Sequence, residues 1–333
     1  MKKGLCGNIT IATGAEYTKM RIRYISCVMP ETTQFKVHEL EELPKEPGTV
    51  RVLVVAGNMS HFASDINRIC FEYWLNLNTE SPCTHWDHII YVPGPFEYGK
   101  GTIDMGDDRC EMLNMLAPGK LIVMGSSESM VQSVYFDGPG VRFVGAACWP
   151  KQAAVYQMSR VFEIEGSGHK TALDAVGANH TLRAKTANKK LRQDAQCIIN
   201  TLKKFEDKSS DEVRVVVTYG CPAEVLASEI KGNGEHPFSA TVKMGSKEDY
   251  DYLARHVDYW IYGALGDKNA DTIAKGRGSD VHKTAAAVGK ERTTMFVRNH
   301  YLQSRGHFEV EDSIFVNRQI LAVPRVQVSE ETK

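Results

Sequence analysis

The feature of this sequence that most constrains its fold is a series of short, almost uniformly apolar runs. Residues 50–56 read Val-Arg-Val-Leu-Val-Val-Ala, residues 213–218 read Val-Arg-Val-Val-Val-Thr, and residues 88–92 and 141–146 are similar in length. Apolar runs of this length, rich in β-branched residues, are typical of strands that are covered on both faces. We therefore expect an α/β fold in which sheets are buried between other layers.

Other segments complete this pattern. Residues 20–26 alternate apolar and polar side chains, as a half-buried strand does, and further strands are expected at 120–124, 258–262, 294–297 and 314–323. Two helices are predicted by apolar residues at three- and four-residue steps. The stripes that predict them are Phe62, Ile66, Ile69, Cys70 and Tyr73 in the first helix, and Leu191, Ala195, Ile198, Leu202 and Phe205 in the second.

The first of these helices falls between two strands, which predicts a βαβ unit. A third helix is expected at 223–230. No repeat or break divides the chain, so we expect one domain over 20–325 with an irregular insertion at about 150–184. An N-terminal extension (1–19) and a C-terminal tail (326–333) flank this domain.

Composition excludes some partners. The 40 basic and 41 acidic residues give a formal net charge of -1, so no long-range electrostatic field is expected to attract nucleic acid or an anionic membrane. No apolar run has the roughly 18 residues of a membrane span, and the first residues lack a secretory signal. The eight cysteines have no metal-binding or redox spacing. We expect free thiols in an intracellular, reducing compartment, with the cytoplasm as the best assignment.

The strands end in short loops, where the chemistry of an α/β protein usually gathers. Five of these ends carry a distinctive order of residues. They read Ser26-Cys27-Val28-Met29, then Ala56-Gly57-Asn58, then Gly94-Pro95-Phe96-Glu97, then Thr218-Tyr219-Gly220-Cys221-Pro222, and finally Gly263-Ala264-Leu265-Gly266.

In their order along the chain and in their local sequence, these strand ends resemble the calcineurin-like metallophosphoesterases. The similarity runs from about residue 20 to about residue 323. The resemblance implies a layered αββα sandwich of two mixed β-sheets flanked by helices. It also implies two divalent metals, such as Mn, Fe or Zn, held at the strand ends. In that family a bridging hydroxide attacks phosphorus while the metals neutralise the phosphate oxygens.

The first three family motifs have lost their ligands here. The family has Asp-x-His after its first strand, Gly-Asp after the second and Gly-Asn-His-Glu after the third. The matching positions of this chain hold Cys27 and Met29, then Asn58, then Pro95 and Phe96. These are soft donors, one neutral amide and two side chains without a ligating atom.

The last two motifs are altered in the same way. The family's Thr-His pair is matched by Thr218 and Tyr219, and its Gly-His-x-His by Gly263, Ala264 and Gly266. With no imidazole or carboxylate left at these positions, we expect no metal cofactor and assign no catalytic residue. The eight replaced positions would then form a vestigial pocket.

Three hypotheses remain open. The first is a pseudoenzyme that acts as a structural or protein-binding module, with a protein partner of unknown identity. The second is a working phosphoesterase that uses displaced ligands such as His61, Asp65 or Asp267. The third is a metal-free binder of phosphate or nucleotide in the vestigial pocket. We favour the first, and the question of enzymatic activity is left to experiment.

Two further clusters are interpreted as structural. His85, Asp87 and His88 contain metal-binding side chains, but strand alternation would point the two imidazoles in different directions. The lysines of the second predicted helix (Lys189, Lys190, Lys203 and Lys204) are interpreted as a solvated helix face.

Overall fold

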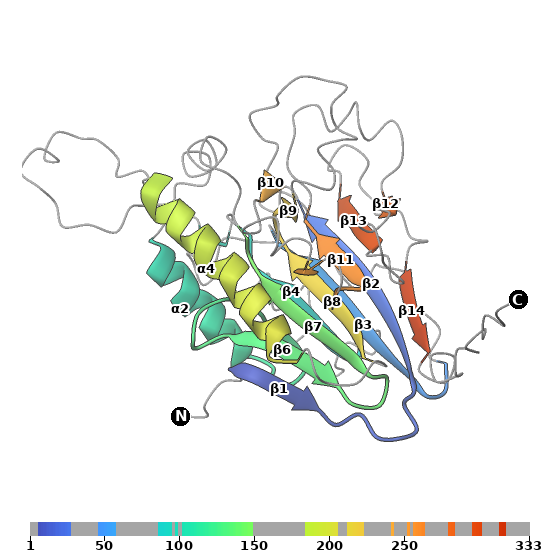
Figure 1. Ribbon diagram of the computed structural model, residues 1–333. Helices are drawn as coiled ribbons and strands as arrows, with labels where there is room; N and C mark the ends of the chain where they lie inside the picture. Colours follow the sequence, from blue (N-terminus) through green and yellow to red (C-terminus); the bar gives the residue numbers. More distant parts are fainter. Residues whose placement is uncertain are drawn as a thin grey trace, which may run out of the picture.

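The computed structural model describes about half of the chain. The described residues are 6–27, 46–57, 86–94, 97–98, 102–148, 184–205, 212–222, 241–242, 252–253, 256–263, 279–283, 295–301 and 313–317. The predicted helices at 62–73 and 223–230 and the insertion up to residue 183 lie outside these residues. Two layers of strands with helices outside them make up the described part (Figure 1).

The first layer is built on three parallel pairings. β2 pairs with β3, β3 with β4 and β4 with β5, while β14 pairs antiparallel with β2. The strands are β2 (Lys19–Cys27), β3 (Thr49–Ala56), β4 (His88–Val92), β5 (Leu121–Val123) and β14 (Ser313–Asn317). β3 and β4 are parallel neighbours, as the predicted βαβ unit requires, and the helix of that unit lies outside the described residues.

The second layer is also mixed. β7, β8, β11 and β13 run parallel in that order, and β6 pairs antiparallel with β7. At the edges, β1 pairs parallel with β6 and β12 antiparallel with β13. The strands are β1 (Gly7–Ile11), β6 (Val131–Phe136), β7 (Val141–Ala146), β8 (Val213–Thr218), β11 (Tyr259–Tyr262), β12 (Ser279–Lys283) and β13 (Met295–Tyr301).

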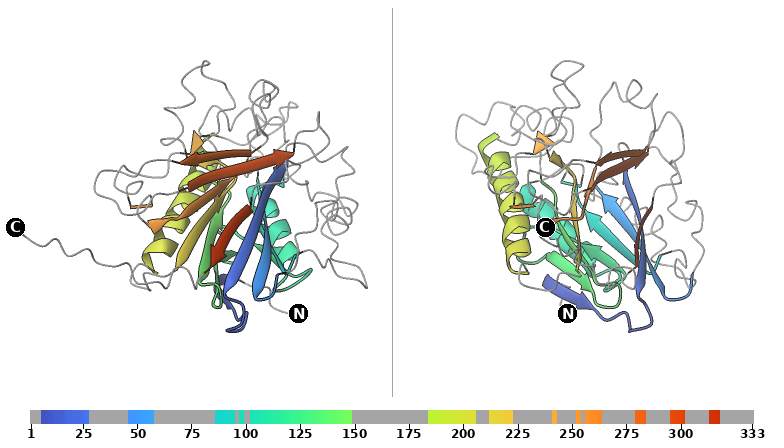
Figure 2. Two further views of the ribbon diagram at one scale, coloured as in Figure 1. Left: turned by 90° about the vertical axis from the view of Figure 1, so that its right-hand side faces the viewer. Right: turned by 45° about the vertical axis from the view of Figure 1, so that its right-hand side comes forward.

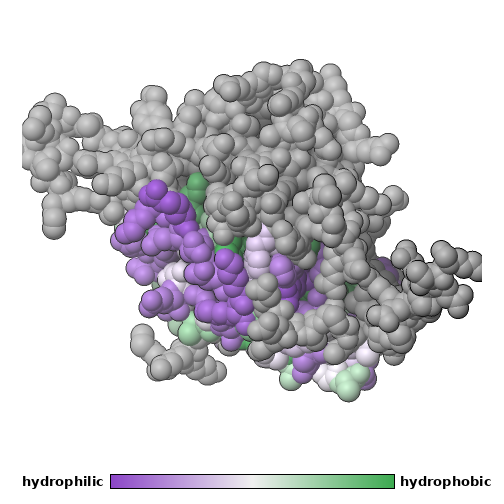
Figure 3. Space-filling model, in the orientation of Figure 1, coloured by the Kyte–Doolittle hydropathy of each residue, from purple (hydrophilic) through white to green (hydrophobic). Residues whose placement is uncertain are grey.

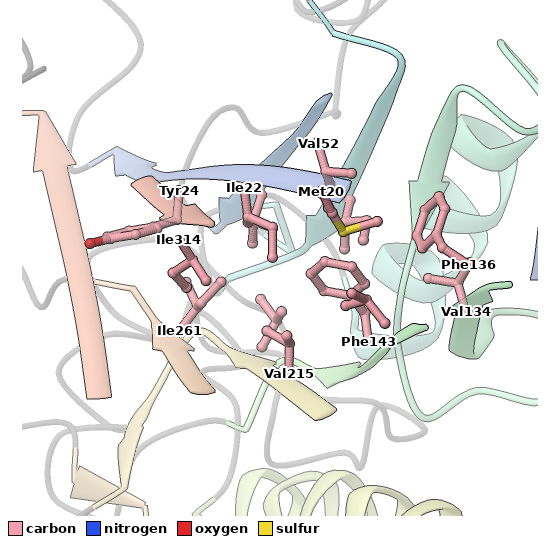
Figure 4. Packing of buried hydrophobic residues seen from close by; sticks show 14 of the residues in the cluster. Met20, Ile22, Tyr24, Val52, Val134, Phe136, Phe143, Val215, Ile261 and Ile314 are labelled. Carbon is pink, nitrogen blue, oxygen red and sulfur yellow. The ribbon is translucent and has the colours of Figure 1, made fainter. Parts of the chain in front are cut away.

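A single strand joins the two layers. β13 pairs with β11 through its first residues and with β2 through His300 and Tyr301, so the described strands of both layers belong to one 12-stranded hydrogen-bonded network. The network folds over on itself. Figure 4 shows Met20 and Ile22 of β2 facing Phe143 of β7 and Val215 of β8 across the core.

This core explains the apolar runs in the sequence. Every residue of β3, β7 and β8 is buried. Alternate side chains of these strands meet the opposite layer, and α4 covers the outer face of β7 and β8. Each aliphatic side chain that is fully buried in this way contributes about 1.5–3 kcal/mol of transfer free energy. The packing of the two layers is therefore the main source of stability.

Two helices cover the outer faces. α4 (Ala184–Lys203) packs Leu191, Ala195, Ile198 and Leu202 against β7, β8 and β11, which confirms the predicted stripe. α2 (Ile103–Asn114) lies against β5, and the Asn114 side chain bonds both the N–H and the C=O of Val123, which satisfies the strand edge. Figure 2 shows the two helices outside the strand layers, and they come close enough for Lys190 of α4 to contact Asp107 of α2.

The expected fold class, an α/β sandwich of two mixed sheets with helices outside, is thus confirmed. A separate pair of two-residue strands, β9 (Cys221–Pro222) and β10 (Thr241–Val242), follows β8. In the part of the chain that the structure describes, no helix is both long and apolar enough to span a membrane.

Candidate functional site

The strand ends that carry the family-like motifs lie together in the structure. Gly57 follows β3, Gly94 follows β4, Tyr219 follows β8 and Gly263 follows β11, and all four residues are buried. A Cβ atom built on Gly57 would lie 2.7 Å from Cδ2 of Tyr219 and 2.9 Å from Cα of Gly94. The two layers therefore bring these loops into direct contact, as the sequence predicted.

The ring of Tyr219 occupies the centre of this contact. The same Cδ2 atom would lie 2.9 Å from a Cβ on Gly263, and that Cβ would lie 2.3 Å from the carbonyl oxygen of Ala56. Only glycine fits at either position, and Gly57 also has a positive φ of 81°. Tyr219 is 2% exposed, so an aromatic side chain fills the space between the loops.

Hydrogen bonds fix the end of β8 in this position. The backbone N–H groups of Tyr219 and Gly220 both donate to the carbonyl of Ala147 after β7, at 3.1 and 3.3 Å. The Thr218 hydroxyl accepts a hydrogen bond from Nε1 of Trp260 at 2.9 Å and donates to the carbonyl of Gly220 at 2.7 Å. Buried polar groups satisfied in this way make the loop rigid.

The end of β4 is held by Glu97. Its buried carboxylate accepts hydrogen bonds from the hydroxyl of Tyr91 and, at 2.8 Å, from the backbone N–H of Gly94. In the sequence, Glu97 is part of the third motif, and no role is predicted for it. Its distance of three residues from Gly94 is the signal that could have suggested a loop-closing carboxylate.

A buried ionic cluster lies behind these loops, where α2 and α4 meet. Lys190 of α4 places its ammonium 3.1 Å from Oδ1 of Asp107 on α2, 3.7 Å from Oδ1 of Asp194 and 3.3 Å from the hydroxyl of Ser126. The side chains of Lys190 and Asp194 are 6% and 0% exposed. We call Lys190, Asp194, Asp107 and Ser126 the ionic cluster.

This arrangement corrects the interpretation of Lys190 as part of a solvated helix face. Lys189, Lys203 and Lys204 are exposed, as expected, but Lys190 is buried because Asp194 lies one turn further along α4 and Asp107 faces it from α2. A buried ammonium persists only when carboxylates pair with it. The pairing with α2 is a tertiary contact that the pattern along α4 does not encode.

The cluster reaches both strand-end loops. Oδ2 of Asp194 accepts the backbone N–H of Cys148 at 2.9 Å, next to the Ala147 carbonyl that holds Tyr219. Oδ1 of Asp107 accepts the hydroxyl of Tyr98 at 2.7 Å, next to Glu97. Charged side chains on two outer helices therefore fix the ends of β7 and β4.

Electrostatics give the cluster a structural rather than a proton-transferring character. Burial lowers the pKa of Lys190, but the carboxylates of Asp194 and Asp107 outweigh burial and raise that pKa above its ordinary value. Lys190 therefore stays an ammonium and cannot act as a base toward Ser126. Burial also raises the pKa of the Tyr98 hydroxyl and of the Cys148 thiol well above their ordinary values, so neither ionises near neutral pH.

Most of the positions expected in the vestigial pocket lie outside the described residues. These are Met29, Asn58, Pro95, Phe96, Ala264 and Gly266, together with the weaker candidates His61, Asp65 and Asp267. Of the other two, Tyr219 is buried between the loops and Cys27 ends β2 beside Tyr301 of β13.

The described residues contain no group of three or more His, Cys, Asp or Glu side chains placed to hold a metal. His88, from the other cluster considered in the sequence, donates from Nδ1 to the carbonyl of Gly119 at 2.7 Å and packs edge-on against Phe136. These contacts give His88 a packing role.

Comparisons with known proteins find similarity among solved structures. No protein-family model and no curated protein match the sequence. Among solved structures, the chain is similar to the phosphopantetheinyl hydrolase from Mycobacterium tuberculosis, with a TM-score of 0.45 and 13% identity. That alignment covers 89% of this chain and 98% of the hydrolase.

Proposed function

We propose that this chain is a non-catalytic relative of the calcineurin-like metallophosphoesterases that serves as a protein-binding module. The observation that carries the proposal is the position of Tyr219, whose ring packs on Gly57 and Gly263 between the strand ends. A metallophosphoesterase needs this region for imidazole and carboxylate ligands and for the phosphate. A buried phenol ring supplies neither a ligand set nor open space.

The sequence of the neighbouring loops supports the same conclusion. Each buried glycine that contacts this region precedes a position where the family motif is altered: Gly57 precedes Asn58, Gly94 precedes Pro95, and Gly263 precedes Ala264. Two divalent cations need several anionic or imidazole donors to offset their loss of hydration. An amide oxygen, a proline ring and a methyl group cannot provide them.

The intact framework supports a binding role over loss of all function. The ionic cluster and Glu97 hold the strand-end loops with charged and polar groups. Among these, Lys190, Asp194 and Glu97 are buried, and buried groups of this kind are costly unless every partner is present. A fold that depends on different residues from its chemistry can keep its shape after the chemistry is lost. A reducing intracellular compartment suits the buried thiols of Cys110 and Cys148.

The proposal is tested on the purified full-length protein after incubation with Mn²⁺, Fe²⁺ or Zn²⁺. Elemental analysis should find far less than one ion per chain, and hydrolysis of an aryl phosphate should not exceed the buffer blank. Stoichiometric metal together with turnover would instead establish a phosphoesterase. In that case His61→Ala, Asp65→Ala and Asp267→Ala would each reduce the rate if displaced ligands were responsible.

The same preparation distinguishes the third hypothesis. Inorganic phosphate and a nucleotide are added separately in the absence of metal, and the melting temperature is followed. A ligand that binds the native state raises the melting temperature, and the shift keeps growing with the logarithm of the ligand concentration above its Kd. No shift is expected, and a shift of this kind without metal would establish a phosphate or nucleotide binder in place of a protein-binding module.

A further inference from the structure

The solvent-facing side of α2 is unusual for a surface helix. The large apolar side chains that are exposed in the described part of the chain all lie on α2 or in the turn after it: Met105 is 46% exposed, Met112 49%, Met115 46% and Leu116 37%. Met105 and Met112 are seven residues apart and so lie on one side of the helix, while Met115 and Leu116 lie in the turn that follows it. We call Met105, Met112, Met115 and Leu116 the methionine face.

The neighbouring helix shows what an ordinary solvent face looks like in the same molecule. The exposed residues of α4 include Lys189, Arg192, Gln193, Asn200 and Lys203, and Figure 3 shows the surface over α4 as hydrophilic. α2 instead has apolar residues on both sides, because Cys110 and Leu113 are buried on its inner side. Contiguous exposed apolar groups of this kind mark an interaction surface.

The charges beside the methionine face are acidic. Asp104 and Asp108 are exposed between the apolar side chains, and Glu111 is half-buried nearby. Arg109 is the basic residue of the helix, and the fourth carboxylate, Asp107, is turned inward to Lys190. A partner that covers this face therefore gains from positive charge next to its apolar residues.

The helix that presents this face is firmly held. The Thr102 hydroxyl accepts the N–H of Met105 at the N-cap, Asp107 binds Lys190 and Tyr98, and Asn114 bonds to Val123. A rigid face loses little entropy on binding. Methionine side chains add adaptability, because their flexible thioethers fit apolar partners of different shapes.

We propose that the methionine face of α2 is the docking site for a basic amphipathic helix of a partner protein. Its apolar residues, at helical spacing, pack on Met105, Met112 and Leu116, and its Lys or Arg residues lie beside Asp104 and Asp108. A second copy of this chain fits less well, because it would bring the same aspartates to the interface and like charges repel.

The proposal deepens the proposed function and rests on it, since a non-catalytic module acts through its partner. The probe is a fluorescent synthetic helix of leucine and lysine, with leucines at i, i+4 and i+7, compared with the same helix carrying glutamate for lysine. Fluorescence anisotropy with the full-length protein should show saturable binding of the lysine peptide and at least about tenfold weaker binding of the glutamate peptide.

Variants assign the binding to α2. The double variant Met105→Gln/Met112→Gln should weaken binding at least about tenfold, while Gln193→Ala/Asn200→Ala on α4 is the matched control and should bind as the wild type does. Asp104→Asn/Asp108→Asn should weaken binding and reduce its dependence on salt. Unchanged melting temperatures show that the variants are folded, because the substituted side chains are exposed.

Several results would overturn the proposal. They are no binding of the lysine peptide, equal binding of both peptides, or an affinity that Met105→Gln/Met112→Gln leaves unchanged. A concentration-dependent dimer that this variant abolishes would assign the face to a second copy instead. Metal content and hydrolysis, measured on the same preparations, are independent of α2, so failure of the docking site and failure of the proposed function are distinguishable.

Discussion

Asp194 of α4 accepts the backbone N–H of Cys148 at 2.9 Å and so holds the end of β7 in a left-handed conformation, with a φ of 47° at Cys148. A non-glycine residue adopts this conformation at a cost of roughly 1–2 kcal/mol, which the surrounding contacts must offset. The residue before it, Ala147, accepts the two N–H groups that position Tyr219 and Gly220. A carboxylate of α4 is thus connected, through Cys148 and Ala147, to the backbone that carries Tyr219.

Removal of the Asp194 carboxylate should strongly destabilise the protein. Among the described residues, Asp194→Ala leaves the buried ammonium of Lys190 with Asp107 as its one carboxylate partner, and breaking a buried pair in this way costs about 3–5 kcal/mol. Urea denaturation measures the free energy of unfolding, with exposed Gln193→Ala as a control that should change it by less than about 0.5 kcal/mol. The double variant Lys190→Met/Asp194→Ala should lose less unfolding free energy than the two single variants lose together. If the losses were additive, Lys190 and Asp194 would not be energetically coupled.

The packing of Tyr219 on Gly57 can be tested with two alanine substitutions at the same backbone angle. Gly57 and Gly119 have φ values of 81° and 82°, but a Cβ on Gly119 would meet nothing within 4 Å. Gly119→Ala should therefore cost only the left-handed penalty of roughly 1–2 kcal/mol, while Gly57→Ala should cost about 1–3 kcal/mol more for overpacking. Equal losses of unfolding free energy would show that Tyr219 does not fill the space beside Gly57.

Because of His88, the protein should lose stability in mild acid. Burial lowers the pKa of His88 below its ordinary value of 6.5, although the hydrogen bond to Gly119 acts in the opposite direction. The unfolded chain therefore binds a proton at this residue at a higher pH than the native protein does. The contribution of the neutral His88 side chain to the free energy of unfolding is fully present above pH 6.5. It is lost as the pH falls from there through the folded-state pKa.

Unfolding free energies measured between pH 5 and 7.5 test this prediction. The wild type should lose up to about 1.4 kcal/mol per pH unit more than His88→Gln does, because a glutamine side chain does not titrate. Identical pH dependence in the two proteins would exclude His88 as the source of the loss of unfolding free energy in acid.

The thiols should react in an order set by burial. Cys6 is exposed, whereas burial raises the pKa of Cys110 and Cys148 well above the ordinary value. Only the thiolate reacts with iodoacetamide, so Cys6 should be alkylated in the native protein before Cys110 or Cys148. Peptide mass mapping after a timed reaction measures the order, and denatured protein, in which all three should react, is the control. Early labelling of Cys148 would contradict its place in the core.

The buried strands could be predicted because the residues of each strand are mostly apolar. The predicted segments 88–92, 141–146 and 213–218 match β4, β7 and β8 residue for residue, since each run is mostly apolar and carries apolar side chains on both faces. The edge strand β1 was not predicted, because alternate residues of Gly7–Ile11 are exposed and the pairing with β6 is a tertiary contact.

The sequence of α2, by contrast, contains no such signal. Its apolar residues lie on both sides, so no amphipathic stripe marks it, and Gly106 interrupts it. In the structure that glycine is required, because a Cβ there would lie 2.1 Å from the ring of Tyr98. At the candidate site, the meeting of the strand ends followed from the motifs, whereas the ring of Tyr219 against Gly57 and the burial of Lys190 depend on contacts between distant segments.

The most direct test of the account is a crystal structure of the protein grown with excess Mn²⁺, with anomalous diffraction recorded to locate the metal. We expect no anomalous peak where Gly57, Gly94, Tyr219 and Gly263 meet, and the ring of Tyr219 in that space. Two strong peaks roughly 3.5–4 Å apart, ligated by protein side chains at these strand ends, would contradict it.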